Sequence, residues 1–131
     1  IMLTAYADVQ IAVDAMRNGA WHFLEKPCRA SQMVSVVADA ISWSRERRIA
    51  HRQLEEWRRR FRLLTAREAE IAQLLAAGQT ARDIASLLRR SHHTVAHQRK
   101  SILEKMEVES VVDLTRILMK LEAPEDDSDP A

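Results

Sequence analysis

The chain has 131 residues, 47% of them hydrophobic and 30% charged, and it contains only two glycines and three prolines. This length and apolar content fit one ordinary domain or two small ones with a buried core, and they exclude a chain that is disordered throughout. The richness in Ala, Leu, Arg and Glu favours a mainly helical protein. Because no apolar run is long enough to span a bilayer and no segment resembles a secretory leader, we expect no membrane segment and a cytoplasmic location.

The formal net charge of +1 conceals an uneven distribution along the chain. Residues 44–63 carry eight basic and three acidic side chains, whereas residues 122–131 carry five acidic and no basic ones. A basic segment suits a polyanionic partner, although a solvated helix face has the same composition. We expect the acidic segment to be disordered, because it is too polar to bury.

The first elements predicted are a strand, a helix and a second strand. The apolar run that ends before Thr4 is typical of a buried parallel strand. Asp8 can cap a helix that stops at Gly19, and the segment "WHFLEKP" predicts a second strand ended by Pro27. The order predicts a crossover unit with parallel strands. Since the chain opens inside a strand, we expect it to be a fragment of something longer.

A long helix is predicted next, from its cap at Ser31 to about Arg62, because no Gly or Pro interrupts this stretch. Its apolar residues are spaced four and three apart, as in a coiled coil. Two interpretations stay open: the two halves pack on the domains at either end, or the helix dimerises. The apolar seam consists of Val36, Ala40, Trp43, Ala50, Leu54, Trp57, Phe61 and Leu64.

Four short helices are predicted over residues 64–121. Gly78 ends the first, and the few residues between the second and third are typical of a helix-turn-helix. In the second helix, Ile84, Leu87 and Leu88 form the predicted inner face. Each helix begins at a residue that can cap it, and three of these caps have an acidic residue three positions later: Thr65 with Glu68, Thr80 with Asp83, Ser110 with Asp113, and Ser91 alone.

The third of these helices has two distinct sides. Val95, Ile102 and Met106 fall on the side that can be core. The opposite side offers hydrogen-bond donors and one small residue, as a helix in the DNA major groove requires, and it consists of His93, Ala96, His97, Lys100 and Glu104. Arg99 and Lys105 flank this side and can meet phosphates.

His93 and His97 could also grip a metal ion together, because they stand four residues apart on one side of the helix. Two ligands are too few, since a stable zinc site has about four, three of them from protein in a catalytic site. Nearby residues supply no further ligand set, and Cys28 is the only cysteine. We therefore expect no metal and no cofactor.

The segment "LTAREAEIAQLLAAGQTARDIASLLRRSHHTVAHQRKSILEKMEVESVVDL" resembles the LuxR-type DNA-binding domain of FixJ/NarL-type response regulators. The resemblance extends over nearly all of residues 64–121 and implies double-stranded DNA as partner. It implies base-facing positions at Ala96, His97 and Lys100, and phosphate contacts by Thr94, Arg99 and Lys105. The family usually has His immediately before the Arg, whereas this chain has Gln98 there, so the base preference cannot be carried over.

The fourth helix offers more apolar surface than one core contact requires. Its core stripe is Val111, Leu114, Leu118 and Leu121, and Val112, Thr115 and Met119 lie off that stripe. The resemblance implies a homodimer on DNA through this helix, with two half-sites roughly 34–36 Å apart. The residues expected to contribute to dimerisation are Val111, Val112, Thr115 and Met119.

Residues 1–43 resemble the last part of a receiver domain, the phospho-acceptor module of the same regulators. The resemblance rests on Thr4 at a strand end, on Gly19, and on Phe23 three residues before Lys26. It implies that Thr4 and Lys26 bind a phosphoryl group and that Phe23 moves with phosphorylation. The acidic pocket and acceptor aspartate belong to earlier strands, so we expect this chain not to accept phosphate, and a sensor kinase to act on the full-length protein.

Together these patterns predict a mainly α protein. A strand-helix-strand-helix receiver remnant (residues 1–43) is followed by a linker helix (44–63), a four-helix LuxR-type module (64–121) and an acidic tail (122–131). The expected function is sequence-specific DNA binding and transcriptional regulation at the output of a two-component system, without catalysis. The main alternative is a dimerisation or protein-interaction module with secondary or lost DNA binding; a phosphotransfer enzyme is a third interpretation, and we expect no such activity.

Overall fold

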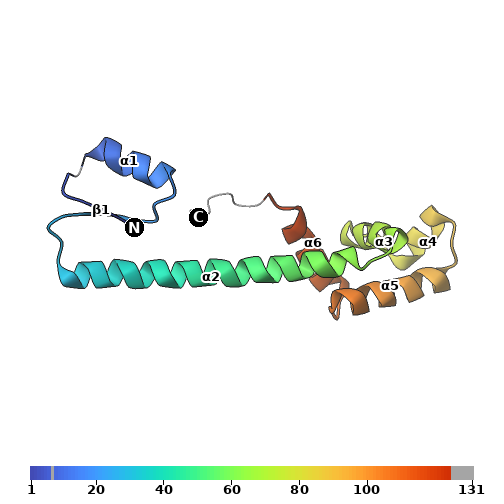
Figure 1. The fold of residues 1–131 in the computed structure, drawn as a ribbon. Helices are drawn as coiled ribbons and strands as arrows, with labels where there is room; N and C mark the ends of the chain where they lie inside the picture. Colours follow the sequence, from blue (N-terminus) through green and yellow to red (C-terminus); the bar gives the residue numbers. More distant parts are fainter. Residues whose placement is uncertain (7, 125–131) are drawn as a thin grey trace. The chain divides into compact units, whose positions relative to one another are not determined.

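The computed structural model describes residues 1–6 and 8–124, and over these residues the chain is mainly helical, as predicted (Figure 1). The predicted acidic tail lies outside the described residues from residue 125 onward. In chain order the elements are β1 (Met2–Thr4), α1 (Val9–Arg17), β2 (Phe23–Glu25), α2 (Ala30–Arg62), α3 (Ala66–Ala76), α4 (Ala81–Leu88), α5 (His92–Met106) and α6 (Val111–Glu122).

The chain divides into two compact units, residues 1–50 and residues 51–123. The division falls inside α2, so the last three turns of this helix belong to the second unit. The linker boundaries expected at residues 44 and 63 stay a prediction.

In the first unit, β1 and β2 form the predicted parallel pair, with Met2 opposite Phe23 and Thr4 opposite Glu25. The crossover helix α1 begins where expected, because the Asp8 carboxylate accepts a hydrogen bond from a backbone N–H of the first turn. The predicted strand-helix-strand unit is therefore confirmed.

The prediction that the first strand is buried is wrong within this chain. The side chains of Met2 and Leu3 are exposed, and Val9 on α1 is 80% exposed. The described elements of this unit supply two strands, one crossover helix and the start of α2, which cover too little of the sheet. Among the described residues of this unit, Leu24 and Val36 are the buried hydrophobic ones.

Helix α2 runs over the predicted stretch but begins slightly earlier. The Met33 N–H donates to the Arg29 carbonyl at 3.1 Å, so Ser31 lies within the first turn and does not cap it. The apolar seam is used at both ends: the Trp43 ring lies 6.2 Å from the Trp21 ring in the first unit. In the second unit the residues of this helix that pack against the core are Trp57 and Phe61.

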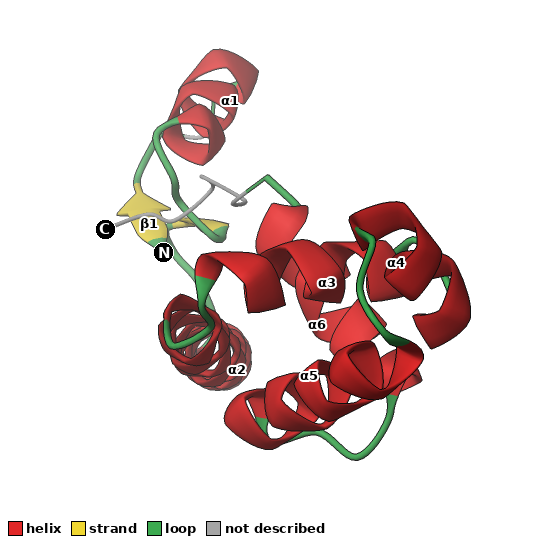
Figure 2. Ribbon diagram, turned by 90° about the vertical axis from the view of Figure 1, so that its right-hand side faces the viewer, coloured by secondary structure: helices red, strands yellow, loops and turns green. Residues whose placement is uncertain are grey.

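The second unit is the predicted four-helix module, with α3, α4, α5 and α6 gathered around one core (Figure 2). Burying each large aliphatic side chain contributes about 1.5–3 kcal/mol. The largest fully buried side chains are Ile71, Ile84, Val95, Ile102, Met106 and Leu114. Ile117 is also buried, although the apolar stripe expected on α6 did not include it.

All four predicted helix caps are present in the second unit. The side chains of Thr65, Thr80, Ser91 and Ser110 each accept a hydrogen bond from the backbone N–H three residues later. Glu68 and Asp83 complete reciprocal capping boxes. These local bonds fix where each helix starts, and a single cap contributes about 1 kcal/mol.

The predicted inner face of α4 was wrong at one position. Leu87 is 62% exposed, whereas Ile84 and Ala85 are buried and Leu88 packs against the core. At about 100° per residue, Ala81, Ile84, Ala85 and Leu88 share one side of the helix and Leu87 lies about 110° from its middle. Ala85, the smaller residue, therefore takes the core position.

Candidate nucleic-acid interface

The turn between α4 and α5 is closed by local hydrogen bonds. Arg89 takes a left-handed conformation with φ of 52°, and the Arg90 N–H donates to the Ala85 carbonyl at 2.9 Å. Ser91 then caps α5 by accepting from the Thr94 N–H at 3.1 Å, and the two hydroxyls lie 2.8 Å apart. These bonds satisfy the end of one helix and the start of the next, which fixes the geometry of the predicted helix-turn-helix.

Helix α5 has one fully buried side and one solvent-facing side, as its periodicity predicted. Val95, Ile102 and Met106 are fully buried in the core. The solvent-facing side chains predicted to face DNA comprise the exposed His93, His97, Lys100 and Glu104 and the half-buried Ala96. A rigid helix thus presents one ammonium group, one carboxylate and two imidazoles around a small residue, which permits close approach to a groove.

The predicted phosphate-contacting residues differ in their surroundings. Arg99 is exposed, whereas Thr94 is half-buried and its hydroxyl is hydrogen-bonded to Ser91. The Lys105 ammonium donates to Glu68 Oε2 at 2.7 Å and so has a protein partner that the sequence did not reveal. A phosphate contact by Lys105 stays a prediction.

Glu68 is the buried charged residue of the described chain, at 7% exposure, and it ties α3 to α5. One carboxylate oxygen accepts from the Thr65 N–H at 2.9 Å and from Lys105, and the other accepts from the Ser101 hydroxyl at 2.8 Å. Burial alone would raise the pKa of Glu68, but these hydrogen bonds outweigh it and lower the pKa from 4.5 to about 2. The carboxylate therefore stays ionised and links the cap of α3 to the middle of α5.

Arg60, in the last turn of α2, makes a second polar contact with α5. The Arg60 guanidinium lies 2.8 Å from the Glu107 carboxylate and 3.4 Å from the Met106 carbonyl, both at the C-terminal end of α5. Glu56, one turn earlier on α2, accepts from the Arg60 Nε at 3.2 Å. A cation at this position also interacts favourably with the helix dipole. No local sequence pattern predicts this contact, because its partners are more than 40 residues apart.

Gln98 is the position at which this chain departs from the LuxR-type sequence pattern. Its side chain is half-buried, and Oε1 is buried without a hydrogen-bond partner among the described residues. The residue lies on α5 between the core and the side predicted to face DNA. An unpaired buried amide oxygen costs about 1–3 kcal/mol.

The residues expected to dimerise on α6 are not equivalent. Val112 and Met119 are 61% and 67% exposed, whereas Val111 packs against the core. Thr115 is half-buried and its hydroxyl donates to the Val111 carbonyl at 2.7 Å. The apolar surface available to a partner is therefore formed by Val112 and Met119.

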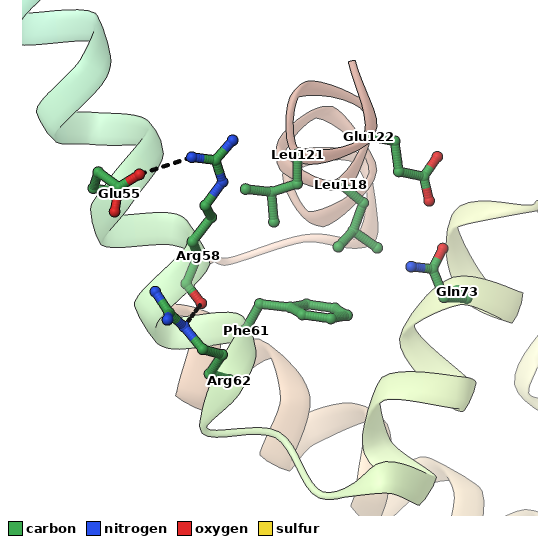
Figure 3. Close-up of a pocket in the computed structure, with 8 residues that line it drawn as sticks. All are labelled: Glu55, Arg58, Phe61, Arg62, Gln73, Leu118, Leu121 and Glu122. Carbon is green, nitrogen blue, oxygen red and sulfur yellow. Dashed lines mark hydrogen bonds and ion pairs between the residues drawn. The ribbon is translucent and has the colours of Figure 1, made fainter. Parts of the chain in front are cut away.

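A hollow of about 570 Å³ lies beside α6 in the second unit, against the end of α2 and α3 (Figure 3). The rings and branched side chains of Phe61, Leu118 and Leu121 form its apolar part. Charged residues surround them, including the ion pair of Arg58 with Glu55 at 2.7 Å.

The receiver-like residues of the first unit come together at the strand ends. The Lys26 N–H donates to the Thr4 carbonyl at 2.7 Å, so the two residues are neighbours after β2 and β1. The Thr4 hydroxyl accepts from the Tyr6 N–H at 3.2 Å, and Phe23 is half-buried on β2. Their roles in a phosphorylation switch stay a prediction.

Residues 1–6 and 8–124 show neither a candidate metal site nor a candidate membrane span. These residues contain no group of three or more His, Cys, Asp or Glu side chains placed to hold a metal ion. Within the same residues, no helix combines the length and hydrophobicity needed to cross a membrane.

Comparison with known proteins gives a consistent result. Residues 62–124 match the family described as "Bacterial regulatory proteins, luxR family". The chain is 35% identical over 122 residues to the transcriptional regulatory protein TdiR of Thauera aromatica, covering 92% of this chain and 53% of that protein. It is 33% identical over 131 residues to the transcriptional regulatory protein FixJ of Azorhizobium caulinodans, covering 99% of this chain and 62% of that protein.

Solved structures agree with these relatives. The response regulator StyR superimposes with a TM-score of 0.75 at 30% identity, covering 92% of this chain and 61% of that one. Full-length FixJ from B. japonicum gives a TM-score of 0.53 at 28% identity, covering 91% and 59%. The chain thus spans between about half and three-fifths of the length of these proteins. Residues 62–124 therefore form a helix-turn-helix domain of the luxR family, and the chain is homologous to response regulators.

Proposed function

We propose that this chain is the output part of a response regulator, which binds specific double-stranded DNA through α5 and regulates transcription. The observation that supports this most directly is the two-sided character of α5. Val95 and Ile102 hold the helix against the core, while His97 and Lys100 are exposed on the opposite side. This arrangement in a luxR-family domain matches what a recognition helix in the major groove requires.

The residues proposed to contact DNA have distinct chemical tasks. The Lys100 ammonium donates to the O6 and N7 of a guanine, and His97 supplies a donor or an acceptor to a base edge. Ala96 lets the helix backbone approach the groove. Arg99 and Thr94 contact phosphates, which set the position of the helix but carry no sequence information.

The partners of the whole protein belong to the same proposal. A sensor kinase controls the full-length regulator, and a second copy pairs through Val112 and Met119 on α6, which places two α5 helices on neighbouring half-sites. The chain acts in the cytoplasm, where its DNA target lies, and performs no catalytic step of its own.

A second candidate function is an interaction module that has lost DNA binding. The exposed Val112 and Met119, together with the apolar hollow beside Leu118 and Leu121, favour it because a protein partner could cover them. This candidate predicts that the chain binds DNA weakly or not at all, whereas specific recognition predicts a sequence preference and a steep dependence on salt.

The test is to select bound sequences from a random DNA pool and to measure affinities by fluorescence anisotropy. We expect Lys100→Ala to weaken binding to the selected duplex about tenfold and binding to a scrambled duplex about twofold, because a base contact is lost together with one charge. Arg17→Ala removes the same charge from α1 and serves as the matched control. Equal losses on both duplexes would show that Lys100 reads no base, and a selection without any enriched sequence would favour the interaction module.

A further inference from the structure

Helix α2 ends in contact with the helix that is proposed to read DNA. Arg60 lies in the last turn of α2, and its side chain is 20% exposed, with partners for the guanidinium on two sides. Glu56 holds the Nε, while Glu107 and the Met106 carbonyl take the two terminal nitrogens. This contact lies outside the four-helix pattern of residues 64–121, since its donor belongs to the preceding helix.

The end of α2 is itself fixed on the core of the second unit. Trp57 and Phe61, on either side of Arg60, pack against the buried cluster, and the Lys120 ammonium of α6 lies 5.2 Å from the Trp57 ring centre. Arg60 therefore projects from a packed support. Because its own helix is fixed, Arg60 can restrain the end of α5. A side chain on a frayed helix could not, since it would move together with its partner.

Arg60 contacts α5 at its C-terminal end, where backbone carbonyls no longer have hydrogen-bond partners within the helix. Glu107 takes a left-handed conformation with φ of 54°, which ends the helix, and the last carbonyls of a helix have no partner within it. Arg60 supplies a donor to one of these carbonyls and a positive charge at the negative end of the helix dipole.

We propose that Arg60 is a positioning residue for DNA recognition, which holds the C-terminal end of α5 so that the side chains facing DNA keep their orientation. The inference rests on the proposed DNA-binding function. Val95 is fully buried near the start of α5 and Met106 near its end, with Lys100 between them. Without Arg60 the end of α5 keeps only the burial of Met106 and the contacts of Glu68, so the helix is held less firmly and Lys100 is oriented less precisely. Base contacts tolerate such a loss of orientation less well than phosphate contacts do.

The experiment compares charge variants of the 131-residue chain on a selected and a scrambled duplex at one salt concentration. Arg60→Gln should weaken binding to the selected duplex about fivefold and to the scrambled duplex less than twofold. Arg59→Gln is the matched control, because Arg59 is adjacent and forms its ion pair with Glu56 at 2.6 Å, while Glu107 acts on it only by longer-range charge attraction. It should lower both affinities equally.

Glu107→Gln separates positioning from simple attraction between charges. Removing this carboxylate makes the chain more positive, so attraction alone predicts tighter binding to both duplexes. Positioning predicts weaker binding to the selected duplex, since Arg60 loses its partner. Arg60→Lys keeps the charge but loses the forked geometry, and it should give an intermediate loss on the selected duplex. Tighter binding by Glu107→Gln, or equal losses on both duplexes for Arg60→Gln, would overturn the inference.

Amide hydrogen exchange tests the same contact without DNA. Arg60→Gln should speed exchange in the last turn of α5 at least threefold, whereas Arg59→Gln should leave it unchanged. Unchanged exchange in Arg60→Gln would refute the positioning role, even if the chain proved to bind no specific sequence. Failure of the selection experiment with faster exchange in Arg60→Gln would instead count against the proposed function alone. Circular dichroism melting of each variant shows that the fold is retained.

Discussion

The strongest quantitative prediction concerns the buried carboxylate of Glu68. Its pKa falls from 4.5 to about 2 on folding, despite the opposing effect of burial, because Lys105, Thr65 and Ser101 hydrogen-bond to the ionised form. A lowered pKa means that the folded state binds the proton less readily than the unfolded state. The resulting stability is fully present above about pH 4.5 and is lost as the pH falls toward 2.

The size of the effect follows from the shift. A difference of about 2.5 pKa units corresponds to roughly 3 kcal/mol in the free energy of unfolding at pH 7, and about half of this remains at pH 3. Because Glu68 is only 7% exposed, solvent screening reduces this little. Glu68→Gln should therefore lower the free energy of unfolding by roughly 3 kcal/mol at pH 7 and by about half as much at pH 3.

Urea unfolding followed by circular dichroism at pH 7, 5 and 3 measures this difference. Glu70→Gln is the matched control, because Glu70 lies on the same helix but is exposed and pairs with Arg67 at the surface. Its effect should stay within about 0.5 kcal/mol at each pH. If the difference between the wild-type chain and Glu68→Gln were the same at pH 7 and pH 3, the hydrogen-bonded carboxylate could not be its cause.

Three further changes test other parts of the molecule. Gln98→Leu should raise the free energy of unfolding by about 1 kcal/mol, because it removes the unpaired buried oxygen; a lower melting temperature would show that the amide has a partner after all. Thr80→Ala should cost about 1 kcal/mol by breaking the cap of α4, as urea unfolding would reveal, and no change would mean that the cap does not bear on stability. Met119→Glu should reduce dimerisation on DNA at least tenfold in sedimentation analysis, and Gln79→Glu, on an exposed turn, should not; equal behaviour would place the dimer contact elsewhere.

Local chemistry explains what could be predicted from the sequence. A cap such as Ser91 acts on a backbone group three residues away, so the evidence for it lies within one short stretch. Helical periodicity likewise separated the buried Val95 from the exposed Lys100 on α5. These features gave the element order, the four-helix module and the exposed side of the candidate site.

The features that could not be predicted depend on residues far apart in the chain. Glu68 and Lys105 are separated by 37 positions, and no spacing rule joins them. On α4 the error had a different cause, because hydrophobicity was followed where helical periodicity, at about 100° per residue, already places Ala85 on the buried side and Leu87 off it. The burial of a strand such as β1 depends on the neighbouring strands and on the helices that cover the sheet, and these cannot be read from the residues of the strand itself.

The end of α2 packs against the core of the second unit, and this limits where the four-helix module can be separated from the rest of the chain. A chain started at Leu64, where the luxR-type sequence pattern opens, would lose Trp57 and Phe61 from the packed cluster and Arg60 from the end of α5. Fusions of the module to another domain should therefore join the chain before residue 51. A shorter piece would keep every helix of the recognition pattern but lose part of the scaffold that supports it.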